Sequence, residues 1–156
     1  MTAEGHKFYP GERATAEQVL QLAREYRQAA EKLIECGRRR QPLSLAPLRM
    51  VAIHAIELYL NALLLAAGRP AGQVRGLHHD LGRRSELAIE FGLPLRKRTV
   101  AHLGTLSETR EYLLTRYDPE ASAASQVNRL MATLAEVSEK VPLWISSSRT
   151  KASASK

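Results

Sequence analysis

The segment from Ser44 to Ala67 is apolar on nearly every side of a helix, and this feature constrains the fold more than any other. At about 100° per residue, one face is formed by Leu48, Ala52, Ala55, Tyr59, Ala62 and Ala66, and the opposite face by Met50, Ile53, Leu60 and Leu64. A helix that is apolar all round is buried on both sides. This helix is therefore either the centre of a helical bundle or a helix whose second face meets another subunit.

Capping signals mark the helices in the first half of the chain. Thr15 and Gln18 form a capping box, in which each side chain bonds the backbone N–H of the other. The first helix begins there and continues to Gly37, a residue typical of helix ends. Ser44 is expected to cap the apolar helix, which tolerates Pro47 in its first turn.

Three further helices are predicted after residues 69–79, which we expect to form a connecting loop. Asp80 caps a short helix over 81–91. The apolar stripe of the next helix consists of Leu103, Leu106, Arg110, Leu113 and Tyr117. Asp118-Pro119-Glu120 is typical of a helix start, and Pro142 is expected to end this fifth helix.

These elements predict an all-α fold, because no segment shows the alternation of a β-strand. Five helices with mostly short connections favour an antiparallel, up-and-down bundle. We expect residues 14–143 to form this domain and residues 1–13 to be a flexible N-terminus. Residues 144–156 are basic and rich in Ser and Ala, so we expect a disordered tail.

The composition is typical of a cytoplasmic protein. The only cysteine, Cys36, excludes an internal disulfide, which agrees with a reducing compartment. Residues 1–13 are polar, unlike a signal peptide, and the longest apolar run, 62–67, is too short to cross a bilayer. We therefore expect a cytoplasmic protein without a membrane span.

The formal net charge of +7 favours a polyanionic partner, with nucleic acid first. Clusters of Lys and Arg occur at 38–40, 83–84 and 96–98. The alternative is that these cations are solvated. Residues 38–40, for example, lie just past a predicted helix end, where cations interact favourably with exposed carbonyl groups.

Polar side chains interrupt the apolar helix along one stripe. His54, Glu57 and Asn61 follow each other at spacings of three and four, which places them close enough to hydrogen-bond. A carboxylate in such a helix requires a cation or hydrogen-bond donors. Arg110 and Arg116 of the fourth predicted helix are the candidates. The group is either a buried polar cluster that fixes helix register or the wall of a pocket.

The other histidines have weaker signals. His78 and His79 could line a phosphate site beside the free N–H groups of the helix after Asp80, although Asp80 as a simple cap is the preferred interpretation. A metal site is not expected, because these three residues lack a second ligand cluster. No cofactor is expected, since the chain has no phosphate-binding glycine loop. His102 is expected at the surface.

Three motifs resemble a known family. Ala52-Ile53-His54-Ala55-Ile56-Glu57-Leu58-Tyr59-Leu60-Asn61-Ala62-Leu63-Leu64 resembles the second-helix signature of HEPN domains. The motifs His79-Asp80-Leu81 and Arg116-Tyr117-Asp118-Pro119 are similar to the family's next two landmarks, in the same order. The match covers residues 14–140. The family often has a Lys at the position of Asn61, and this Lys would neutralise Glu57 within the same helix. Because the Lys is absent here, Glu57 depends more on an arginine from another helix.

The resemblance implies a helical domain that pairs as a homodimer, associates with nucleotide or RNA, and is encoded beside a nucleotidyltransferase partner. Within such a domain we expect the ligand-binding residues to be His54, Glu57, Asn61, His79, Asp80, Arg110, Arg116 and Tyr117. An alternative is an interaction module that docks a partner protein without contacting nucleic acid.

A second alternative is a metal-independent ribonuclease of the toxin type, because some members of the family cut RNA with an Arg and a His four to six residues apart. Arg49 and His54 have this spacing. Five residues along a helix, however, correspond to about 140° of rotation, so the two side chains diverge. The active members also differ from this chain at Met50 and Ile56. We therefore expect binding without cleavage.

Overall fold

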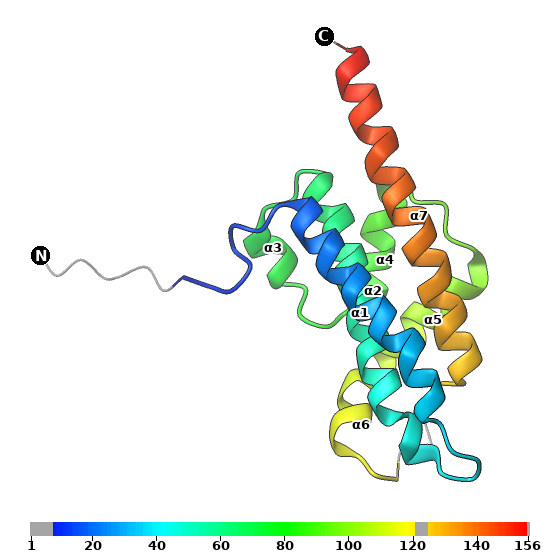
Figure 1. The fold of residues 1–156 in the computed structure, drawn as a ribbon. Helices are drawn as coiled ribbons and strands as arrows, with labels where there is room; N and C mark the ends of the chain where they lie inside the picture. Colours follow the sequence, from blue (N-terminus) through cyan, green and yellow to red (C-terminus); the bar gives the residue numbers. More distant parts are fainter. Residues whose placement is uncertain (1–7, 121–124, 156) are drawn as a thin grey trace, which may run out of the picture.

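The computed structural model describes residues 8–120 and 125–155, and over these ranges the chain is helical, with a single isolated β-bridge between Arg38 and Gln41 and no strand (Figure 1). The α-helices are α1 (Ala16–Leu33), α2 (Ala46–Ala66), α3 (Ala71–Arg75), α4 (Leu81–Glu90), α5 (Lys97–Glu108), α6 (Glu111–Tyr117) and α7 (Val127–Ala154), and the 3-10 helices are η1 (Ile34–Cys36) and η2 (Pro42–Leu45). The all-α prediction is confirmed, whereas the described part contains seven α-helices and not five.

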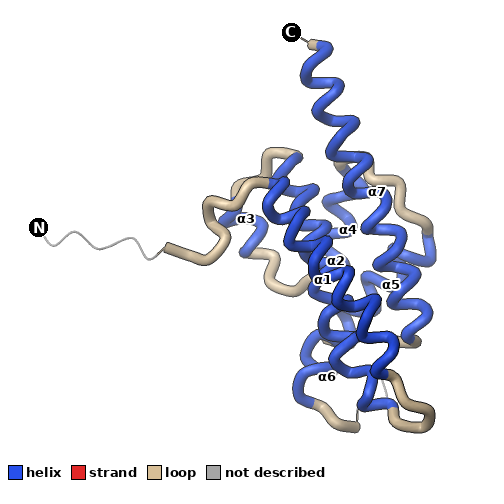
Figure 2. The backbone as a smooth tube through the Cα atoms, viewed as in Figure 1, coloured by secondary structure: helices blue, strands red, loops and turns tan. Residues whose placement is uncertain are grey.

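The apolar helix α2 is the centre of the fold, with α1, α4, α6 and α7 packed around it (Figure 2). On its second face, Ile53 is 4% exposed, and Leu60 and Leu64 are fully buried. This face is covered by other helices of the same chain. The first of the two alternatives for this helix is therefore correct for Ile53, Leu60 and Leu64, which are core residues, whereas Met50 on the same face is 39% exposed.

By length and composition, the segment Pro42–Ala66 is also apolar enough to cross a membrane. The central helix of a soluble protein passes the same test, and 56% of the apolar window is buried inside this structure. Its hydropathy is thus accounted for by its position in the core.

Local capping agrees with the sequence at α1 and differs at α2. The Thr15 hydroxyl accepts a bond from the Gln18 N–H at 3.2 Å, and the Gln18 side chain accepts from the Thr15 N–H at 2.9 Å, which confirms the capping box. Ser44 does not cap α2. Its hydroxyl accepts from the Arg38 N–H and donates to the Gln41 carbonyl, so it closes the preceding loop.

The fourth predicted helix is divided at Arg110. This residue has a φ of 51° and ψ of 45°, a left-handed conformation that ends α5 and redirects the chain into α6. The first residue of α6, Glu111, is 1% exposed, and its carboxylate accepts hydrogen bonds from the Ser125 N–H and hydroxyl. The stripe expected to run from Leu103 to Tyr117 is therefore not continuous.

The last helix begins later and ends later than predicted. Asp118 does not start it but accepts a bond from the Glu120 N–H in a turn, and α7 begins at Val127. Pro142 lies inside α7, and the segment predicted as a disordered tail is helical to Ala154. Figure 1 shows this end of α7 projecting beyond the other helices.

One smaller prediction also needs correction. The segment 69–79 is not only a loop, because it contains α3. Of the expected flexible N-terminus, residues 1–7 lie outside the described residues. Residues 8–14 form a turn with hydrogen bonds from the Glu12 N–H to the Tyr9 carbonyl and from the Ala14 N–H to the Gly11 carbonyl, both 3.0 Å.

Candidate functional site

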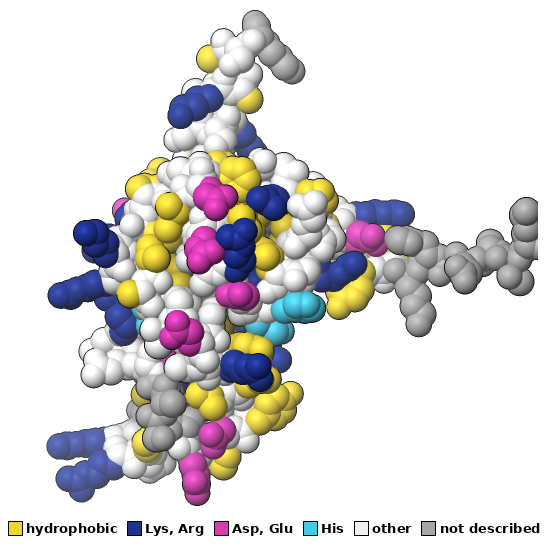
Figure 3. Space-filling view, turned by 180° about the vertical axis from the view of Figure 1, so that it is seen from behind, with side chains coloured by type: hydrophobic (Ala, Val, Ile, Leu, Met, Phe, Trp, Pro, Cys, Tyr) yellow, Lys and Arg dark blue, Asp and Glu magenta, His cyan; other side chains and the backbone are white. Residues whose placement is uncertain are grey.

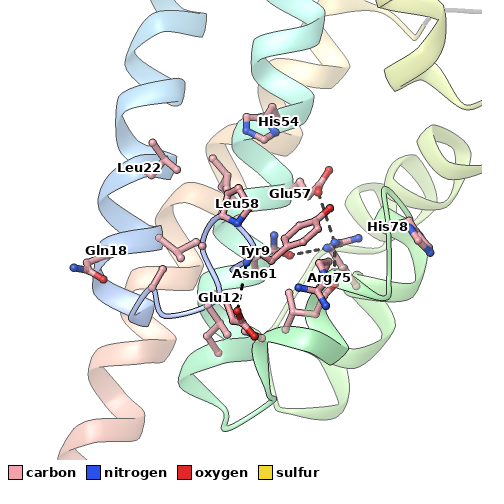
Figure 4. A pocket seen from close by; sticks show the side chains of 18 of the residues that line it. Tyr9, Glu12, Gln18, Leu22, His54, Glu57, Leu58, Asn61, Arg75 and His78 are labelled. Atoms are coloured by element: carbon pink, nitrogen blue, oxygen red, sulfur yellow. Dashed lines mark hydrogen bonds and ion pairs between the residues drawn. The ribbon is translucent and has the colours of Figure 1, made fainter. Parts of the chain in front are cut away.

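A cavity of about 870 Å³ lies between α1, α2, the N-terminal turn and the segment from α3 to α4 (Figure 4). Its wall is formed by Tyr9, Pro10, Gly11, Glu12, Ala14, Gln18, Val19, Leu22, His54, Glu57, Leu58, Asn61, Leu65, Ala71, Val74, Arg75, His78, His79 and Arg84. The cavity thus brings together four residues of the predicted site, His54, Glu57, Asn61 and His79. Its volume falls in the range typical of small-molecule sites.

Glu57 is buried and paired, as predicted, but not with the predicted arginines. It is 9% exposed, with one carboxylate oxygen 3.0 Å from His79 Nδ1 and the other 3.6 Å from Arg84 Nη2. Arg110 and Arg116 are both exposed and do not line the cavity. Arg110 occupies the left-handed break between α5 and α6, so the predicted stripe is not continuous.

The cation that pairs with Glu57 comes from α4. Arg84 is 1% exposed, and its Nε donates to Asn61 Oδ1 at 2.7 Å. Its other nitrogens donate to the carbonyl groups of Asp80 at 3.3 Å and Val74 at 3.4 Å. Burial lowers the pKa of Arg84, while Glu57 and Asp80 act in the opposite direction. An Asn at position 61 fits this environment because it accepts from the guanidinium, where a Lys would repel it.

A sequence signal for Arg84 existed. Arg84 falls three residues after Leu81 and four before Ala88, on the buried stripe of α4. A charged residue in such a stripe requires a partner of opposite charge. Arg83 and Arg84 form one basic cluster in the sequence, but in the fold only Arg83 is exposed.

Two histidines of the cavity are held by aromatic rings. The His79 ring lies 4.6 Å from the ring of Tyr112 on α6, tilted by 37°. The His54 ring makes an edge contact with Tyr26 on α1, at 4.6 Å and 84°. Burial lowers the pKa of His54; Glu57 opposes this effect, and the charges of Arg116 and His79 add to it. At neutral pH the His54 ring is therefore an uncharged hydrogen-bonding group on the cavity wall.

At the cavity mouth, the guanidinium of Arg75 lies 4.1 Å from the centre of the Tyr9 ring. In Figure 4, the side chains of Tyr9, Glu57, Asn61 and Arg75 point toward one another. In the described part of the chain, Arg75 has no carboxylate within ion-pair distance, and the Asn61 amide nitrogen has no hydrogen-bond partner. Both groups remain available to a ligand.

The remaining predicted residues lie elsewhere. Asp80 caps α4, accepting from the Arg83 N–H at 2.9 Å and the Ser107 hydroxyl at 3.0 Å, so the capping interpretation accounts for its contacts. Tyr117 is 76% exposed and outside the cavity. Arg49 donates to the Ser125 carbonyl and is also absent from the cavity wall, whereas His54 lines it. Within one chain, the Arg and the His of the ribonuclease spacing do not share a site.

His102 is a further correction, because it is buried and not at the surface. It is 6% exposed, and its Nδ1 lies 2.7 Å from the Thr133 hydroxyl on α7. Burial lowers the pKa of His102 to about 4, with a smaller contribution from the charge of Arg129. This residue joins α5 to α7 and is not part of the cavity.

No family model, no curated protein and no solved structure matches this chain. Across residues 8–120 and 125–155, no group of three or more His, Cys, Asp and Glu side chains is arranged to hold a metal ion. The candidate site is therefore defined by the geometry of the cavity and by the motif resemblance alone.

Proposed function

We propose that this chain binds a nucleotide in the cavity between α1, α2 and α4. The observation that carries the proposal is the distribution of polar groups on the cavity wall. Asn61 offers a free amide nitrogen on the α2 side, while Arg75 places a cation without an ion-pair partner at the mouth. A nucleotide fits this pattern, because its planar base can bond the polar groups of α2 while its charged phosphate lies at the mouth.

The apolar part of the wall suits a nucleobase. Aliphatic surface on the cavity wall is provided by Leu58 and Leu65 of α2, Leu22 of α1 and Val74 of α3. A ring between these side chains loses contact with water, while its edge bonds the amide of Asn61 and the uncharged ring of His54. Pockets of this kind, mostly apolar with a few convergent polar groups, are typical of small-molecule sites.

The phosphate groups would face the mouth. Arg75 is exposed there, and His78, which lines the same rim, is also exposed. A guanidinium forms paired hydrogen bonds to phosphate oxygens, and the formal net charge of +7 favours approach of an anion. The expected homodimer and a nucleotidyltransferase partner rest on the HEPN resemblance and are not required by this proposal.

The test is calorimetric titration with ATP, GTP and the corresponding nucleosides, using a variant that fills the cavity. Leu22 lines the cavity yet is 47% exposed, so Leu22→Trp should fold and should weaken nucleotide binding at least about tenfold. Leu43→Trp is the matched control, because Leu43 is 56% exposed and outside the cavity. Arg75→Gln should weaken nucleotides but not nucleosides.

The proposal would be refuted if Leu22→Trp and Leu43→Trp bound every nucleotide with equal affinity. If no nucleotide or nucleoside bound to the unmodified protein, docking of a partner protein would become the better interpretation. Thermal unfolding of each variant establishes that a loss of binding is not a loss of fold.

We propose binding without RNA cleavage, since Arg49 and His54 have different neighbours in the fold. The check is incubation of labelled RNA with the protein in the presence of a chelator. Cleavage that disappears in His54→Ala would instead support the ribonuclease, with the two residues meeting across two chains.

A further inference from the structure

A second cavity, of about 430 Å³, lies where α5 begins beside α7. It is lined by Arg96, Lys97, Arg98, Thr99, Arg129, Ala132 and Glu136, and it shares no lining residue with the nucleotide cavity. Figure 3 shows the face of the molecule opposite to that of Figure 1, where dark blue Lys and Arg side chains project from both edges.

The single carboxylate of this cavity is paired with cations, although its Oε1 is buried without a hydrogen bond. Glu136, whose side chain is 7% exposed, accepts a hydrogen bond from the Arg96 N–H at 3.2 Å. Its other oxygen lies 3.5 Å from both Arg96 Nε and Lys140 Nζ. Lys140 also donates to the Pro94 carbonyl. Glu136 thus holds the start of α5 and is shared between two cations, which leaves the other cations of the wall unneutralised.

Three cations on the wall have no partner in the described part of the chain. Lys97, Arg98 and Arg129 make no ion pair there, and the Nε of Arg129 is buried without a hydrogen-bond acceptor. A buried donor without an acceptor costs stability. The first turn of α5 has no side-chain cap, so its free N–H groups add positive potential at the same place.

We propose that this cavity binds a phosphate group. The guanidinium of Arg129 on the cavity wall would attract the phosphate, and the exposed Lys97 and Arg98 would neutralise the remaining charge. The excess of cations over carboxylates on the wall suits a multiply charged anion. The same chemistry is presented by a free phosphate ion and by the phosphodiester backbone of RNA, so the experiment separates the two.

The probes are inorganic phosphate, followed by calorimetry, and a short single-stranded RNA, followed by fluorescence anisotropy. The double variant Lys97→Gln/Arg98→Gln removes two exposed cations of the cavity. Arg38→Gln/Arg39→Gln is the matched control, because it removes the same charge from an exposed loop outside both cavities. Affinity should fall about tenfold in the first variant and less than about twofold in the control.

Arg129→Met provides a second measurement. It should weaken phosphate binding while leaving the melting temperature unchanged or higher, because it removes a buried donor that lacks an acceptor. If Arg129→Met does not fold, the Lys97/Arg98 variant alone decides. Leu22→Trp fills the nucleotide cavity and should bind both probes as tightly as the unmodified protein does. The outcome for the phosphate site therefore does not depend on the outcome for the nucleotide cavity.

Loss of RNA affinity in the cavity variants, without measurable binding of inorganic phosphate, would support the site and assign it to a phosphodiester backbone. Loss of inorganic phosphate affinity would support the site and assign it to a free phosphate. The proposal is overturned if neither probe distinguishes the cavity variants from the Arg38/Arg39 control, since binding would then follow net charge alone.

Discussion

Replacement of His102 tests how closely α5 packs against α7. The ring is 6% exposed, its Nδ1 lies 2.7 Å from the Thr133 hydroxyl, and its Nε2 has no hydrogen-bond partner in the described part of the chain. Burial, followed by the charge of Arg129, lowers the pKa of His102 from 6.5 to about 4. The folded protein therefore keeps this ring neutral at a pH where the unfolded chain protonates it.

The sign and size of the effect follow from linkage. Below pH 6.5 the unfolded chain binds a proton that the folded chain does not, so the free energy of unfolding decreases as the pH falls toward 4. Above pH 6.5 both states are neutral, and His102 causes no pH dependence. The gap between the two pKa values, at about 1.4 kcal/mol per unit, corresponds to a loss of about 3 kcal/mol.

The assay is urea unfolding followed by circular dichroism, from about pH 7.5 to about pH 4.5, on the unmodified protein and on His102→Asn. Carboxylates titrate in both proteins, so the difference between their unfolding free energies isolates His102. We expect the unmodified protein to lose roughly 2–3 kcal/mol relative to the variant over this range. A difference that does not change with pH would refute a buried, neutral His102 and the α5–α7 packing that produces it.

Three other substitutions test the core and the site by urea unfolding. Glu57→Ala should cost about 3–5 kcal/mol, because it removes the carboxylate beside the buried guanidinium of Arg84; a cost under about 1 kcal/mol would mean that the pair is solvated. Leu64→Ala should cost about 2–5 kcal/mol, since Leu64 is fully buried, and a negligible cost would reopen this face of α2 as a surface. Arg110→Gly should be neutral or stabilising by up to about 1 kcal/mol at a φ of 51°, and clear destabilisation would contradict the left-handed break.

Local interactions explain which parts of the fold could be predicted. The capping box of Thr15 and Gln18 and the cap formed by Asp80 involve residues only three positions apart, so they depend little on the rest of the chain. The central position of α2 was also predictable as one of two alternatives, because a helix that is apolar all round must be covered. The polar stripe of His54, Glu57 and Asn61 follows from helical periodicity alone.

Tertiary contacts overrode two local signals. Pro142 is a helix breaker in the sequence, with a typical cost of about 3 kcal/mol inside a helix. In the structure, Val141 and Ile145 are buried on either side of it, and Trp144 donates to the Phe91 carbonyl at 2.9 Å. The packing of α7 against the rest of the fold therefore stabilises this helix enough for it to continue past Pro142. Arg110 shows the opposite case. The sequence there contains no Gly or Pro that would predict a helix end, yet the helix ends.

Periodicity and composition alone indicate that the chain is helical, that both faces of α2 must be covered, and that Glu57 requires a cation or hydrogen-bond donors. The identity of the cation depends on how the helices pack. Arg84 is 23 residues from Asn61 along the chain and reaches it because α3 and its flanking turns bring α4 back against α2. The choice among several arginines depends on where the connecting segments turn. Periodicity places a side chain on one face of its own helix, but it does not specify the helix that this face meets.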